Sequence, residues 1–117
     1  MLNDRLAVAK EVASQLLPAE TDLENAIVYA SRLTIAVVEG RRKARLPITI
    51  GQEALGHVAA ATAQLVQARG QLGRAHLALR AAKDEIGLRT FAMGDLWDCP
   101  PSTSAENVTP IGGANAA

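Results

Sequence analysis

A few side chains in this sequence carry the chemistry of catalytic or ligand-binding groups, and their positions decide whether they can act together. Cys99 is the only cysteine. A cysteine nucleophile needs a base within reach and surroundings that favour the thiolate. Cys99 instead follows the carboxylate of Asp98 and precedes two prolines, and nothing in the sequence assigns it a histidine. We therefore expect no catalysis from this thiol, and one cysteine cannot form a disulfide or a cysteine-based zinc site within the chain.

The two histidines are the next candidates, as metal ligands or as a pH switch. His57 and His76 lie about 28 Å apart along a continuous helix, so one chain cannot bring them to one ion. The adjacent carboxylates of Asp84 and Glu85 point to different faces of a helix. The Gly-x-x-Gly at 70–73 has neither a preceding strand nor the Lys-Ser/Thr ending of a phosphate-binding loop. The sequence thus predicts no enzyme, no cofactor and no metal.

A run of four cations could contact phosphates, as in a nucleic-acid-binding protein. It consists of Arg41, Arg42, Lys43 and Arg45. The alternative is a solvated linker or helix end, where cations stabilise the negative end of the helix dipole. No aromatic residue is interleaved for base stacking, and the net charge of the chain is zero. Nucleic-acid binding is therefore the second interpretation.

The elements that position these groups are helices, because apolar residues recur at helical spacing. A first helix is predicted at about 2–17, with an apolar stripe of Leu2, Leu6, Ala9, Ala13 and Leu16. Pro18 is expected to end it. A second helix is predicted at about 22–39, after a Thr21-x-x-Glu24 capping box and before Gly40 as C-terminal glycine. Its stripe is Leu23, Ile27, Ala30, Leu33 and Val37.

A third, long helix is predicted at about 51–93, where two rows of apolar residues recur every seven positions. Thr49-x-x-Gln52 is a candidate capping box at its start. Large residues in one row and alanines in the other are typical of a coiled-coil seam. The seam consists of Val58, Leu65, Leu72, Leu79 and Ile86 with Ala61, Ala68, Ala75 and Ala82. We expect this seam to pack against a second copy or another protein.

Four glycines interrupt this helix: Gly56, Gly70, Gly73 and Gly87. Each costs about 1 kcal/mol in a helix interior relative to alanine. A turn at Gly70–Gly73 would give a compact four-helix bundle. We prefer a continuous helix, because the seven-residue repeat passes the glycines without a change of phase.

One flank of the seam is polar and partly basic, with Thr62, Arg69, His76 and Lys83 in one row. A basic row requires acidic counterparts. The first two predicted helices supply them, at Glu11, Glu20, Asp22, Glu24 and Glu39.

The chain after the long helix has a different composition. Phe91, Leu96 and Trp97 are candidate anchors for a partner protein, since aromatic residues concentrate at interface hot spots. Alternatively, they fold back over the end of the helix. We expect a helical domain at 1–98 and a flexible tail at 99–117, which is rich in Pro, Ser, Gly and Ala.

The fold class is therefore predicted to be all-α, with two short helices and one long coiled-coil-like helix in a hairpin or bundle. The short helices cannot cover the long one, which favours oligomerisation or a partner protein. We expect a non-enzymatic protein that works by protein–protein interaction or assembly, for example as a component of a phage or other bacterial assembly. Charged residues near the start argue against a signal peptide, and no segment can span a bilayer, so we expect a cytoplasmic or virion location.

Overall fold

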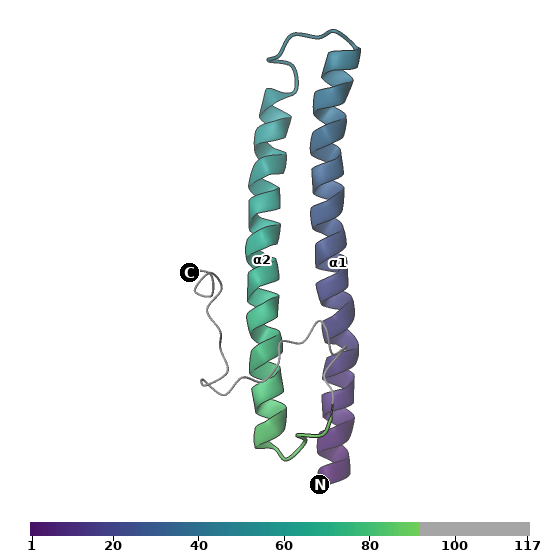
Figure 1. Cartoon of the computed structure of the whole chain (residues 1–117), viewed down its shortest axis with the longest axis vertical. Helices are drawn as coiled ribbons and strands as arrows, with labels where there is room; N and C mark the ends of the chain where they lie inside the picture. Colours follow the sequence, from purple (N-terminus) through teal and green to yellow (C-terminus); the bar gives the residue numbers. More distant parts are fainter. Residues whose placement is uncertain (92–117) are drawn as a thin grey trace, which may run out of the picture.

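The computed structural model describes residues 1–91, and two long helices make up most of this part of the chain. Helix α1 spans Leu2–Lys43 and helix α2 spans Gln52–Glu85. They lie side by side and antiparallel, joined by one turn, in a hairpin about 64 Å long (Figure 1). The all-α class and the helical hairpin are confirmed. The predicted number of helices and several of their ends are wrong.

Pro18 lies inside α1, so the chain does not form separate helices at 2–17 and 22–39. A proline in a helix interior removes a hydrogen bond and costs about 3 kcal/mol or more. Here Pro18 and Ser14, whose carbonyl loses that bond, are both exposed, so water can solvate the oxygen. The buried row continues from Leu16 to Leu23 without a change of phase. Packing of that row outweighs the local cost.

The end of α1 lies beyond Gly40, which is an interior residue and not the predicted C-terminal glycine. The helix closes with two capping bonds, from Leu46 N to Arg41 O (3.1 Å) and from Arg45 N to Arg42 O (3.1 Å). These are the bonds of a Schellman motif. Arg45 occupies its left-handed position, with φ at 55°.

The start of α2 is set by Gly51 and not by the predicted Thr49-x-x-Gln52 capping box. Gly51 is the N-cap residue, with φ at 84°, and no side chain caps this end. A Cβ atom at this position would lie 3.2 Å from Val37 Cγ1. Glycine is therefore required both by the backbone conformation and by the close approach to α1.

Helix α2 passes through Gly70 and Gly73 without a break, which confirms the prediction of a continuous helix. It ends at Glu85 and does not extend to 93. Leu88 N donates to Lys83 O (2.9 Å) and Gly87 N to Asp84 O (3.1 Å), with Gly87 at a φ of 88°. This second Schellman motif turns the chain at Gly87.

Two rows on each helix, recurring every seven residues, make the contact between α1 and α2. All but Arg69 are buried or half-buried, and Arg69 reaches across to Glu24. On α1 the rows are Leu6, Ala13, Glu20, Ile27, Thr34 and Arg41, and Ala9, Leu16, Leu23, Ala30 and Val37. On α2 they are Leu55, Thr62, Arg69, His76 and Lys83, and Val58, Leu65, Leu72 and Leu79.

The hairpin has little core. Among residues 1–91 the only buried apolar side chains are Ala9, Leu16 and Leu88. A single layer of two helices leaves both of its faces open, and many large apolar side chains remain on them. The structure is thus extended and poorly buried. The expected tail at 99–117, and with it the boundary of the predicted domain 1–98, lies outside the described residues.

Candidate interaction surface

The predicted seam is divided between two surfaces of α2. Its large residues Val58, Leu65, Leu72 and Leu79 are half-buried in the row facing α1. Its alanines are not their partners in that contact. Ala61, Ala75 and Ala82 are exposed and Ala68 is half-buried, while Ile86 is the C-cap residue and is exposed. The second row facing α1 is the polar one, which we had expected on a flank.

The polar row of α2 faces α1 because acidic residues of α1 pair with it. His76 Nδ1 lies 2.7 Å from Glu20 Oε1, and Arg69 Nη2 lies 2.7 Å from Glu24 Oε1. The expectation of acidic counterparts is met by these two carboxylates. The His76 side chain is only 3% exposed, whereas Arg69 and Glu24 are more than half exposed. The first pair is thus a buried contact and the second an exposed ion pair.

A groove of about 240 Å³ opens beside these pairs. It is lined by Leu17, Glu20, Thr21, Leu23, Glu24, Arg69, Leu72, Gly73 and His76. Nε2 of His76 is buried and has no hydrogen-bond partner. With the proton on Nδ1, the ring donates to Glu20 and leaves only a lone pair at Nε2, so no buried N–H is orphaned.

A second, shallower groove of about 640 Å³ lies closer to the turn and carries no charged residue. It is lined by Ser31, Thr34, Ile35, Ala59, Thr62, Ala63 and Val66. Ile35 and Val66 are each 54% exposed. Exposed apolar surface of this kind marks sites of protein interaction.

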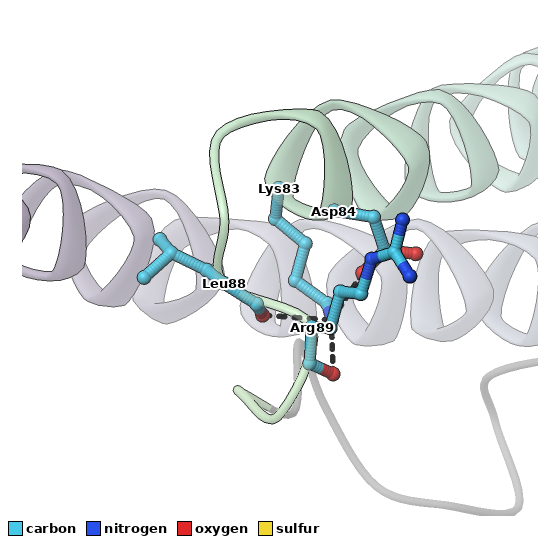
Figure 2. Close-up of polar contacts among 4 residues, drawn as sticks. All are labelled: Lys83, Asp84, Leu88 and Arg89. Atoms are coloured by element: carbon cyan, nitrogen blue, oxygen red, sulfur yellow. Dashed lines mark hydrogen bonds and ion pairs between the residues drawn. The ribbon is translucent and has the colours of Figure 1, made fainter.

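Lys83 is buried near the end of α2 and fastens the residues that follow (Figure 2). Its Nζ donates to Leu88 O (3.1 Å), to Arg89 O (3.0 Å) and to Asp84 Oδ1 (2.9 Å). The hydrogen bond from Lys83 is the main reason why the pKa of Asp84 lies below its ordinary value, and the charges of Lys83, Arg89 and Arg80 add to it. Burial of the ammonium is thereby compensated. We call this arrangement the Lys83 clasp.

The basic run lies at the turn end of the hairpin, where α1 ends. Arg41 is half-buried and its Nη1 donates to Leu46 O (2.9 Å), so it caps the turn. Arg42, Lys43 and Arg45 are exposed. All four lie near the negative end of the α1 dipole, where cations stabilise a helix.

Residues 1–91 hold no group of three side chains able to bind a metal ion. His57 is exposed and lies 3.8 Å from Glu53, one turn earlier on α2. Asp84 belongs to the Lys83 clasp. Phe91 is half-buried. Leu96, Trp97 and Cys99 fall outside the described residues, so the proposed anchor and the thiol stay predictions.

Sequence reasoning missed the role of Lys83 and of the second glycine motif. Gly87, four residues after Lys83, was a usable signal, because glycine is strongly enriched just past the end of a helix. The apolar groove also had a signal. Ser31 and Ile35, like Ala59, Ala63 and Val66, recur at spacings of three and four on faces outside the repeat.

No helix in the described part of the chain is both long and apolar enough to cross a membrane. Comparisons with protein-family models, with curated proteins and with solved structures found no match.

Proposed function

We propose that this chain is a non-enzymatic assembly protein that works by packing its helical hairpin against other protein chains, copies of itself included. The observation that carries the proposal is the poor burial of the hairpin. Residues 1–91 bury only three apolar side chains, while many large ones remain exposed along both helices.

The energetics support a partner. Complete burial of a valine, leucine or isoleucine side chain stabilises a protein by about 1.5–3 kcal/mol relative to exposure. Val28, Ile35 and Val66 retain about half of their surface for a second contact. These exposed apolar side chains can be buried without rearrangement of the hairpin, because a helix of a partner chain can pack directly against the row on α1 or α2.

A component of a larger particle, such as a phage or another bacterial assembly, fits the same physical description. Such a component needs an extended, rigid element with more than one open face. The hairpin offers two open faces over a length of about 64 Å.

Light scattering of the full-length protein over a concentration range tests the proposal. We expect a mass well above the 12.3 kDa of one chain, rising with concentration. A monomer of 12.3 kDa at every concentration would contradict self-assembly. A heterologous partner would then have to be demonstrated by a stable complex with a purified protein.

Nucleic-acid binding is the second candidate function, favoured by the three exposed cations Arg42, Lys43 and Arg45 at the turn. A gel shift at two salt concentrations separates it from the first. Binding at low salt that is lost when these three are replaced by glutamine would support it. No shift at low salt would remove it.

A further inference from the structure

The face of the hairpin that carries the uncharged groove has one row on each helix. On α1 the row is Val28, Ser31, Ile35 and Val38. On α2 it is Gly56, Ala59, Ala63 and Val66. Each row has spacings of three, four and three, so its members share one side of their helix. Five of the eight line or border the same groove, and all are exposed. We call this surface the groove face.

The two rows differ in size. The α1 row supplies the branched side chains of Val28, Ile35 and Val38, while three of the four α2 residues are glycine or alanine. The pairs Glu20–His76 and Glu24–Arg69 set the register of the two helices, and in that register Ile35 lies near the level of Ala59 and Thr21 near the level of Gly73. A large residue on α1 therefore lies beside a small residue on α2 at the two levels nearest the turn, Ile35 with Ala59 and Val38 with Gly56.

We propose, as an extension of the assembly function, that two copies pair through their groove faces about a two-fold axis parallel to the helices. This symmetry places α1 of each copy opposite α2 of the other, with the turns at the same end. Ile35 then faces Ala59 of the second copy, and Val38 faces Gly56 of the second copy. The product is a four-helix bundle in which every neighbouring pair of helices is antiparallel.

Charges along the same face are complementary under this symmetry. Continued at the same spacings away from the turn, the two rows reach Lys10 on α1 and Asp84 on α2, which lie at the same level by the same register. The two-fold axis brings Lys10 opposite Asp84 of the second copy. It likewise brings Glu24 opposite Arg69 of the second copy, and both of these side chains are more than half exposed. A two-fold axis perpendicular to the helices, which puts the two turns at opposite ends, would instead place Ile35 at the level of Lys10 and Asp84 of the second copy.

The available area matches a stable dimer. From Lys10 to Val38 the face is about 42 Å long at 1.5 Å per residue. Two helices side by side are about 20 Å wide. The product is close to the roughly 800 Å² that each partner buries in an interface of standard size. The groove face extended to Lys10 and Asp84 is thus as large as one side of a standard interface.

A matched pair of variants tests the surface. Ala63 lies on the groove face, while Ala60 lies on the outer edge of α2, and both are exposed. Arginine has nearly the helix propensity of alanine, so both A63R and A60R should keep the hairpin, as circular dichroism would show. We expect A63R to raise the dimer dissociation constant at least about tenfold, by burying an unpaired charge, and A60R to leave it unchanged. Equal effects of the two variants would overturn the proposal.

Crosslinking tests the symmetry and covers both open faces. Single-cysteine chains are prepared in a Cys99→Ser background, refolded together in pairs, and treated with a short bismaleimide. Ser31→Cys mixed with Ala63→Cys probes the groove face. Leu33→Cys mixed with Ala61→Cys is the control, because these two positions lie at one level on the opposite face of the hairpin, which carries Ala61, Ala75 and Ala82 and is called the alanine face.

We expect covalent dimer from the first mixture, and several-fold less from the second and from each single-cysteine chain alone. Preferential crosslinking through Leu33 and Ala61 would assign the interface to the alanine face. It would overturn this inference while leaving the assembly function in place. A dimer in light scattering with no crosslink in either mixture would likewise overturn this inference and leave the assembly function in place. A monomer of 12.3 kDa in light scattering would instead contradict both the inference and the self-assembly on which it rests.

Discussion

Nδ1 of His76 lies 2.7 Å from Oε1 of Glu20, although the two residues are 56 positions apart in the sequence. This contact joins the middle of α1 to the last third of α2, in the polar row of the contact between the two helices. A sliding of the helices by one heptad would bring Glu20 to the level of Arg69 or Lys83 and leave the buried imidazole of His76 opposite Ala13 or Ile27, without a partner. Because such a buried polar group is costly when unpaired, the pair selects one register of the hairpin.

Glu20→Ala should destabilise the hairpin by about 1–3 kcal/mol, since it leaves the buried imidazole of His76 without its partner. Replacing both residues by leucine should cost less than this single change, because no polar group is then orphaned. Urea denaturation at one fixed protein concentration measures both. Asp22→Ala, at an exposed position of the same helix, is the control and should stay within about 0.5 kcal/mol of the parent. A double leucine variant less stable than Glu20→Ala would argue against the proposal that the Glu20–His76 pair selects the register.

Lys83→Met should release the residues after α2. The methionine keeps the apolar stem of Lys83 but cannot donate to the carbonyls of Leu88 and Arg89. Amide hydrogen exchange at Leu88 and Phe91 should then accelerate at least about tenfold, as local opening requires less free energy. Amides in the middle of α1 should be unaffected. Lys43→Met is the matched control, because Lys43 is exposed and lies at the other end of the hairpin from the clasp.

Acid should weaken the clasp through Asp84. Its pKa is lowered in the folded chain, chiefly by the hydrogen bond from Lys83. Its stabilising contribution is therefore fully present above the ordinary pKa of 3.8 and is lost as the pH falls through the lower folded value. Asp84→Asn should remove that part of the acid dependence below about pH 4 without altering the profile near neutrality. Thermal unfolding of both proteins from pH 2 to 7 gives the comparison, and identical profiles would contradict it.

Gly40→Ala and Gly51→Ala should have opposite effects on thermal stability. Gly40 lies inside α1, and a Cβ atom there would meet nothing within 4 Å. Alanine should stabilise that position by about 1 kcal/mol. At Gly51 alanine would have to adopt a φ of 84° and approach Val37 to 3.2 Å, so a loss of about 1–2 kcal/mol is expected. Melting temperatures measured at equal protein concentration test this expectation, and a shift in the same direction for both variants would contradict it.

Much of the fold could be predicted from periodicity. The rows containing Leu16, Leu23, Leu65 and Leu72 recur every seven residues, and all of them face the partner helix. Periodicity identified the continuous α2 through Gly70 for the same reason. It could not determine the fate of Pro18, because whether a proline ends a helix depends on packing beyond it. An exposed Pro18 in a helix held by its opposite side is tolerated.

The candidate surface was harder to derive. The row of Ala61, Ala75 and Ala82 is more apolar than that of Arg69 and His76, so composition alone placed the alanines inward. The polar row faces α1 because Glu20 and Glu24 lie at matching levels there. That pairing depends on the register of two segments about 50 residues apart, which no local pattern contains. Once the register is known, the groove face can be identified from the exposed apolar positions that do not face the other helix.

The hairpin brings the end of α2 back beside the start of α1, and this has a mechanical consequence. Arg5 Nη1 donates to Ile86 O (3.3 Å), so the first turn of α1 lies beside the end of α2. A stretching force applied between Met1 and Phe91 would therefore peel the two helices apart, starting from the end opposite the turn. One heptad of contacts would yield at a time, as in a zipper. The same contacts would resist together if one end were pulled against the turn, which makes the hairpin stiff in shear and soft in peeling.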